Sequence, residues 1–157
     1  FDCLVGSEMC IRDRYKIHGN KRKVKKINFD PPFKDKLYLV YLNKKKNSLD
    51  EIKKFKKIKN QKMYTEEISN ITSQIISCND QIEFNSLIKE HEKIISKLTA
   101  RETVKNILFT DFKGEIKSLG AWGGDFILAS SSELTSDYFR NKGYNNIFKY
   151  NELIMNQ

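Results

Sequence analysis

Apolar residues in the first part of the chain form short runs that are typical of strands. Leu37–Leu42 is a continuous apolar and aromatic run that follows Pro31 and Pro32. Its length and its aromatic content predict a buried strand rather than a helix. The stretch Lys23–Phe29 predicts a weaker strand, and we expect its partner to lie outside this sequence.

Four segments in the middle of the chain show the helical period. Ser48–Glu51 has the spacing of a capping box, in which the hydroxyl and the carboxylate satisfy amide donors, so a helix is predicted to begin there. A second helix is predicted over Glu66–Ser77, and a short one over Val104–Leu108. Between them, Asp80 and Glu83 repeat the capping spacing ahead of the clearest helix. Its buried face recurs at steps of three and four residues: Phe84, Leu87, Ile88, His91, Ile94, Ile95 and Leu98.

The last third of the chain returns to strand patterns. Ile116–Leu119 and Phe126–Ala129 predict two strands that the turn Gly120–Asp125 joins. A helix over about Ser136–Lys142 ends at a glycine in the left-handed cap position, and Asn146–Tyr150 predicts the last strand. The order of strand, helices, strand, strand, helix and strand is that of a split β-α-β unit. We therefore expect a ferredoxin-like α+β domain with several helices in its first crossover.

Three parts of the chain differ in composition. Residues 1–14 have no clear period, and the run Cys3–Arg14 resembles the translated read-through of a sequencing adapter. We expect this segment to be non-native and exclude it from the fold; a real, weakly structured terminus is the alternative. Residues 15–36 form a basic segment whose strands we expect to continue from a missing N-terminal domain. Residues 37–157 form the ferredoxin-like domain.

The charge of the chain is uneven. Its 157 residues suit one domain and carry a formal net charge of +9. Between Lys16 and Lys62 there are 17 Lys or Arg against 4 Asp or Glu. Most of these cations are Lys, whereas specific recognition of phosphate and bases favours Arg. We therefore expect a solvated basic face and no nucleic-acid partner, and keep an RNA- or polyanion-binding module over residues 16–62 as the alternative function.

Cysteine usage and hydropathy narrow the function classes further. The three cysteines have neither a disulfide framework nor the spacing of metal ligands, so no metal site is expected. No apolar run approaches the roughly 20 residues that span a bilayer. We expect a cytoplasmic protein without a membrane partner.

Four of the seven glycines lie between Gly114 and Gly124. A glycine-rich turn lets backbone amides approach a phosphate without interference from Cβ atoms, and it permits positive φ angles. A tight hairpin without a ligand is the alternative, because neither the Walker pattern nor the dinucleotide fingerprint is present.

Lys117–Ala129 reads Lys-Ser-Leu-Gly-Ala-Trp-Gly-Gly-Asp-Phe-Ile-Leu-Ala. It resembles the third, C-terminal motif of the GHMP small-molecule kinases, the superfamily of galactokinase, homoserine kinase, mevalonate kinase and phosphomevalonate kinase. The wording is most similar to bacterial members with Leu-Gly-Ala-Trp-Gly-Gly-Asp-Phe. The resemblance covers about residues 15–157, although only the motif is specific. Trp122 stands where most members have glycine. Asp125 favours a substrate from the mevalonate pathway of isoprenoid biosynthesis.

The resemblance implies an ATP-dependent kinase that transfers the γ-phosphoryl group, with Mg²⁺, to a small alcohol or phosphate such as mevalonate or phosphomevalonate. It implies a nucleotide and substrate loop formed by Gly120, Ala121, Trp122, Gly123, Gly124 and Asp125. Lys46, Ser48 and Lys117 are implied substrate contacts, with solvated lysines and a helix cap as the alternatives. For His91, a satisfied core histidine is the alternative to a catalytic base.

The family's ATP-binding loop and catalytic residue have no counterpart in this sequence. We expect both in a missing N-terminal half of the same chain, which would then be the partner of this domain. One motif loop cannot position both reactants, so the chain alone is expected to be inactive. Whether the protein forms a homodimer stays open.

Overall fold

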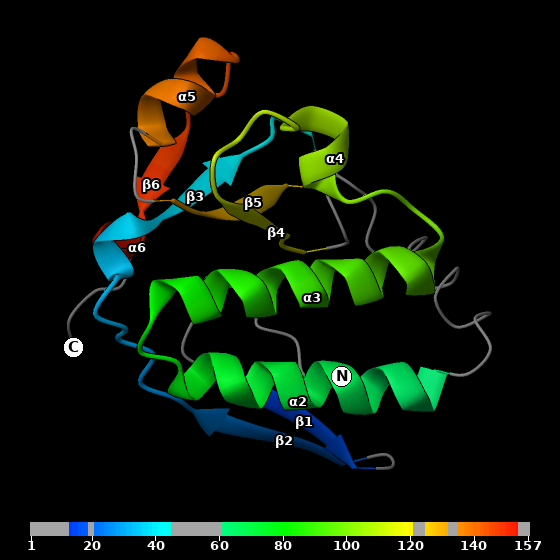
Figure 1. Cartoon of the computed structure of the whole chain (residues 1–157). Helices are drawn as coiled ribbons and strands as arrows, with labels where there is room; N and C mark the ends of the chain where they lie inside the picture. The colour runs from blue at the N-terminus through cyan, green and yellow to red at the C-terminus, as the bar shows by residue number, and fades with distance from the viewer. Residues whose placement is uncertain (1–12, 19–20, 45–60, 121–124, 132–134, 154–157) are drawn as a thin grey trace.

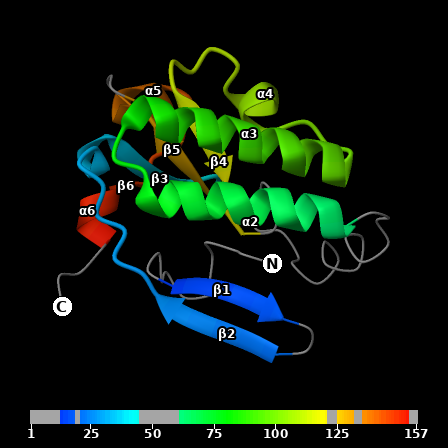
Figure 2. The same ribbon diagram turned by 60° about the horizontal axis from the view of Figure 1, so that its bottom comes forward.

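The computed structural model describes residues 13–18, 21–44, 61–120, 125–131 and 135–153. A four-stranded sheet forms the centre of this part of the molecule. Helix α3 lies directly against the sheet and α2 lies beside α3, as Figures 1 and 2 both show. The helix predicted to begin at Ser48 lies outside the described residues.

The sheet is built from β3 (Leu37–Tyr41), β4 (Glu115–Ser118), β5 (Phe126–Ser130) and β6 (Ile147–Lys149). The strand order is β4-β5-β3-β6, and every neighbouring pair is antiparallel. The chain thus crosses from β3 to β4 through helices, and β5 then inserts between these two strands. This is the ferredoxin-like α+β topology that the order of elements predicts.

The helices are α2 (Gln61–Ser77), α3 (Gln81–Thr99), α4 (Val104–Leu108), α5 (Thr135–Asn141) and α6 (Tyr150–Leu153), with a short 3₁₀ turn before β3. Helix α2 begins five residues earlier than predicted, and the apolar stripe extends back to Tyr64, which packs against the same cluster as Ile68 and Ile71. The last strand is shorter than predicted. It ends at Lys149, and Tyr150, which was predicted to be its last residue, begins α6 instead.

The start of α3 shows why its sequence forms a helix. The carboxylate of Asp80 accepts a hydrogen bond from the backbone N–H of Glu83 at 2.9 Å, which satisfies one of the free amides of the first turn. The Glu83 carboxylate in turn accepts a hydrogen bond from the Cys78 thiol at 3.5 Å. At the other end, Ala100 takes a left-handed cap conformation with φ of 52°.

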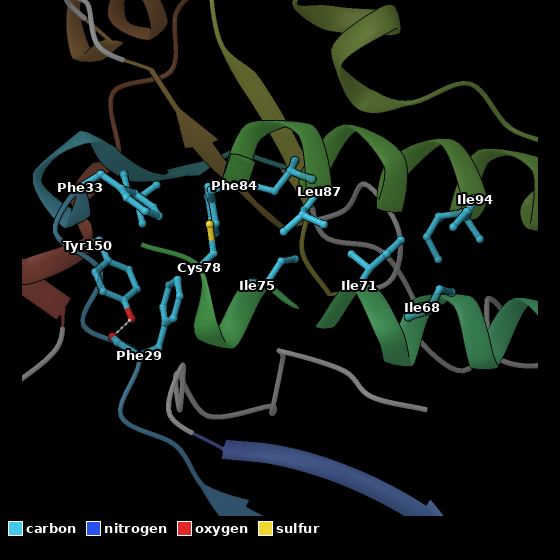
Figure 3. Packing of buried hydrophobic residues seen from close by; sticks show 13 residues of the cluster. Phe29, Phe33, Ile68, Ile71, Ile75, Cys78, Phe84, Leu87, Ile94 and Tyr150 are labelled. Carbon is cyan, nitrogen blue, oxygen red and sulfur yellow. Dashed lines mark hydrogen bonds between the residues drawn. The ribbon is translucent and has the colours of Figure 1, made fainter. Parts of the chain in front are cut away.

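Two apolar clusters cover the two faces of the sheet. Alternation along β5 separates them, since Ile127 and Ala129 join one cluster whereas Leu128 packs against the other. The cluster beneath α2 and α3 contains the aromatic residues Phe29 and Tyr150, and the Tyr150 hydroxyl donates a hydrogen bond to the Phe29 carbonyl at 2.8 Å (Figure 3). The second cluster includes Val104 of α4 and Phe139 of α5. Figure 1 shows these two helices on the side of the sheet away from α3.

The basic segment before the domain forms a separate ribbon. Strand β1 (Asp13–His18) pairs antiparallel with β2 (Lys21–Lys26). The strand expected over Lys23–Phe29 spans Lys21–Lys26 instead, so it begins two residues earlier and ends three residues earlier. The expectation that its partner lies outside the sequence is wrong. The partner comes directly before it, because two residues are enough to connect antiparallel strands.

Candidate functional site

The turn between β4 and β5 closes a hairpin whose two ends have unusual backbone angles. Gly120 has φ of +69° and Asp125 has φ of +51°. The hairpin is closed by a hydrogen bond from the Leu119 amide to the Phe126 carbonyl at 3.0 Å. Positive φ values come at no steric cost to glycine, which explains Gly120, whereas Asp is one of the few other residues that adopt them.

Asp125 ties this hairpin to the end of β3. Its amide donates to the Lys44 carbonyl at 2.9 Å, and its carbonyl accepts from the Leu42 amide at 2.7 Å. One side-chain oxygen, Oδ1, is buried and has no hydrogen-bond partner among the described residues. A buried carboxylate oxygen without a partner is costly, so it marks a position where a ligand donor or cation would be favourable.

Several residues of the predicted site fall outside the described part of the chain: Lys46, Ser48, Ala121, Trp122, Gly123 and Gly124. The described members of the site are Gly120, Asp125 and Lys117. The first two lie at the ends of the β4–β5 turn.

Lys117 lies on β4, and its side chain is 12% exposed. Its ammonium nitrogen is 3.9 Å from Oε1 of Glu92 on α3 and donates to the Ser118 carbonyl at 3.3 Å. The side chain is therefore directed at the carboxylate of α3, and the sequence gives no sign of this pairing.

Glu92 is the centre of a buried polar cluster that the sequence analysis missed. It is 6% exposed, and its Oε2 accepts a hydrogen bond from the Ser118 hydroxyl at 2.9 Å. Its Oε1 lies 3.3 Å from Nδ1 of His91. The position of Glu92, four residues after the buried Ile88, is the signal that could have found it. A carboxylate on the apolar side of a helix requires a partner in the core.

The environment sets the protonation of this cluster. Burial lowers the pKa of His91, and the charge of Lys117 lowers it further, so the imidazole is neutral and its Nδ1–H donates to Glu92. Burial raises the pKa of Glu92. The hydrogen bonds from His91 and Ser118 and the charge of Lys117 outweigh burial, so the pKa of the Glu92 carboxyl lies below its usual range. The cluster thus joins a carboxylate and an ammonium, and it fixes α3 to the strand that leads into the turn.

Gly114 does not belong to the turn, although the sequence groups it with Gly120. A Cβ atom at Gly114 would lie 2.3 Å from the Ser130 carbonyl oxygen and 2.8 Å from the Phe112 ring and from Cβ of Ser131. The glycine is required there by close packing against β5, not by a ligand. The glycine-rich stretch therefore has at least two separate causes.

No helix in the described part of the chain is long and apolar enough to cross a membrane. Within the same residues, no three His, Cys, Asp or Glu side chains come together in the manner of a metal site.

Solved structures share this fold. A mevalonate kinase from Methanococcus jannaschii matches with a TM-score of 0.60 and 20% identity over 86% of this chain. The mevalonate kinase of L. major, solved in complex with R-mevalonate, matches with a TM-score of 0.60 and 16% identity over 83% of this chain. The Lin0012 protein of Listeria innocua matches with a TM-score of 0.58 and 17% identity over 84%.

The chain spans 45%, 43% and 39% of these three proteins, in the same order, and so less than half of each. No family model and no curated protein matches its sequence. At this level of identity the likeness establishes the fold, which is that of part of a mevalonate kinase.

Proposed function

We propose that this chain is the C-terminal part of an ATP-dependent kinase of the GHMP superfamily. The complete protein would transfer the γ-phosphoryl group of ATP to a small alcohol or phosphate, mevalonate or phosphomevalonate. One observation supports the proposal: the chain has a ferredoxin-like fold that also matches part of two mevalonate kinases, and the described residues of the motif Lys117–Ala129 belong to the β4–β5 hairpin.

The described ends of the hairpin fit a site for a phosphate or its acceptor. Gly120 has a positive φ, and no atom of the described residues lies within 4 Å of an added Cβ there, so a ligand has room to approach its main chain. Oδ1 of Asp125, which has no partner among the described residues, would accept a hydrogen bond from a hydroxyl of the acceptor or would coordinate Mg²⁺. Lys117 is held towards Glu92, so we assign phosphate contact to the backbone of the turn rather than to this ammonium.

The N-terminal half of the same protein is the partner that the proposal requires. Phosphoryl transfer depends on holding both reactants in line and on stabilising the charge of the transferred group. ATP with Mg²⁺ supplies the phosphoryl group, and the missing half would supply the loop that holds it. We therefore expect the 157-residue chain alone to release no ADP. As a separate expectation, the whole protein would be located in the cytoplasm.

The test is an ADP-release assay on the complete protein with mevalonate and with phosphomevalonate. Asp125→Asn removes the charge with little change of shape and should lower kcat/KM by about tenfold to a hundredfold, as expected for a lost hydrogen bond to a charged group. Asp137→Asn, on an exposed side chain of α5, is the matched control and should have no effect. Equal activities of the two variants would remove the turn from the site, and no ADP release with either acceptor would reject the substrate class.

A second function, binding of RNA or another polyanion through residues 16–62, is favoured by the register of the β1–β2 ribbon. Within residues 16–62, Lys16 is paired with Lys23. Like charges at directly opposite positions destabilise a two-stranded sheet, and a polyanion would remove that penalty.

This second function has a separate test. The variant Lys23→Glu with Lys25→Glu creates opposite-charge pairs, so it should stabilise the ribbon while it weakens retention on immobilised RNA. The control Lys89→Glu with Lys93→Glu makes the same change of net charge on the exposed face of α3. Equal loss of retention in both variants, or retention that does not fall with salt, would reject a site on the ribbon.

A further inference from the structure

Strand β4, which leads into the β4–β5 turn, lies at an edge of the sheet. Among the described strands it pairs with β5 alone, and its last residue, Ser118, lies opposite Ile127. Backbone hydrogen bonds within the sheet therefore hold β4 on one side only. Any further constraint on its position at the turn comes from the elements packed against it, and α3 is such an element (Figure 1).

Glu92 of α3 contacts the last two residues of β4. Its Oε2 accepts a hydrogen bond from the Ser118 hydroxyl at 2.9 Å, and its Oε1 lies 3.9 Å from the Lys117 ammonium nitrogen. Ser118 and Glu92 are both buried, so water competes little for either group. A hydrogen bond to a buried carboxylate is stronger than one between neutral groups, so it holds its partner firmly in place.

The turn begins directly after these contacts. The Leu119 amide donates to the Phe126 carbonyl at 3.0 Å, and Gly120 with its positive φ follows. The other end of the turn is held elsewhere, because the Asp125 carbonyl accepts a hydrogen bond from the Leu42 amide at 2.7 Å. The two ends of the turn thus have separate anchors, one on α3 and one at the end of β3.

Stability alone does not account for a carboxylate on the buried face of α3. Removing a carboxylate and an ammonium from water costs free energy that their mutual attraction does not always restore. Buried ion pairs can therefore often be replaced by apolar residues without loss of stability, and in some proteins they serve instead to fix one specific arrangement of the chain.

We propose that Glu92 is a positioning residue: it holds the β4 end of the β4–β5 turn on α3 and so sets the backbone of Gly120 for a phosphate or its acceptor. The role in binding rests on the proposed function, whereas the anchoring of the turn does not. The two parts are therefore tested by separate experiments.

The anchor is tested by amide hydrogen exchange of the 157-residue chain, which requires no ligand. Ser118→Ala removes the hydroxyl that Glu92 holds. The Leu119 amide should then exchange about tenfold to a hundredfold faster, as expected for a lost hydrogen bond to a charged group, whereas the Leu42 amide at the other anchor should accelerate much less. Equal acceleration of both amides would indicate global destabilisation, and an unchanged Leu119 amide would indicate no anchor. Either result overturns the proposal.

Matched variants on the exposed face of α3 control for the substitutions themselves. Ser86→Ala and Glu90→Gln should leave both amides at the parent rates. Glu92→Gln removes the charge of the anchor and should accelerate exchange of Leu119 more than that of Leu42. If Ser118→Ala does not fold, Glu92→Gln decides, and a Leu119 rate equal to that in Glu90→Gln overturns the proposal.

The role in the reaction is tested on the complete protein by ADP release with mevalonate and with phosphomevalonate, at a temperature where circular dichroism shows every variant folded. Ser118→Ala should lower kcat/KM by about tenfold to a hundredfold, because small displacements of groups that hold the reactants have effects of this size, and Ser86→Ala should have no effect. Parent-like activity of Ser118→Ala would overturn the role in the reaction. If the unmodified protein releases no ADP, the proposed function fails, and the exchange rates still decide whether Glu92 anchors the turn.

Discussion

Replacing Gly114 with alanine tests the claim that part of the glycine-rich stretch exists for packing. The added Cβ would lie 2.3 Å from the Ser130 carbonyl oxygen, and contacts shorter than 3.0 Å are essentially never found for real Cβ atoms. Reaching an ordinary contact of 3.4 Å from 2.3 Å requires a displacement of about 1.1 Å. Ser130 cannot yield easily, because it is fully buried and pairs with Leu37 on one side and Glu115 on the other.

The ring of Phe112 closes the other side of this position, 2.8 Å from the added Cβ, and it is packed against Phe139 at a centroid distance of 5.2 Å. Forcing extra atoms into a well-packed core costs about 1–3 kcal/mol and sometimes more. Because one contact here is with backbone, we expect Gly114→Ala to lower the free energy of unfolding by about 3 kcal/mol, the upper end of that range.

Gly120→Ala is the matched control. Gly120 has φ of +69°, and none of the described residues has an atom within 4 Å of an added Cβ, so its substitution strains the backbone without any clash among them. That strain costs about 1–2 kcal/mol. Urea unfolding of both variants followed by circular dichroism measures the difference. If Gly114→Ala proves no more destabilising than Gly120→Ala, the close contact with Ser130 does not constrain the fold and the reasoning fails.

Three further predictions concern stability. Asp80→Ala removes the N-cap of α3 and should lower the free energy of unfolding, measured in urea, by about 1 kcal/mol. Asp80→Asn keeps a side-chain oxygen for the cap and should lose much less stability, so equal losses in the two variants would contradict a capping role. Tyr150→Phe leaves the buried Phe29 carbonyl without its donor and should cost about 1–3 kcal/mol in the same assay, and an unchanged midpoint would show that this bond contributes nothing. The pKa values of His91 and Glu92 are both lowered in the folded state, so the unfolded chain binds more protons as the pH falls. The free energy of unfolding should therefore decrease below about pH 6.5 as His91 is protonated, and decrease again below about pH 4.5 as Glu92 is protonated. In His91→Gln the decrease that starts near pH 6.5 should be smaller. An identical decrease in that variant would show that His91 does not cause it.

Helix α3 and the cap at its start followed from local patterns in the sequence, whereas the start of α2 and the short helix α6 did not. The buried face of α3, from Phe84 to Leu98, repeats every three to four residues, and the cap at Asp80 acts on an amide three residues away. Such signals depend only on residues that are near one another in the sequence, so they can be recognised without knowledge of the fold. The order of strands and helices then limited the topology to a split β-α-β unit.

The partners of buried polar groups could not be inferred in the same way. Glu92 and Ser118 are 26 residues apart in sequence, and their hydrogen bond exists because α3 crosses β4. The clash that keeps Gly114 a glycine arises from Ser130 across the sheet. The sequence by itself thus determined the helical periods, the caps and the order of the elements, because each depends on contacts between near neighbours. Only the tertiary structure decided that Lys117 lies beside Glu92, because β4 and α3 are distant in sequence and meet only in the folded chain. The pairing of β1 with β2 is local, but the sequence pattern did not predict β1.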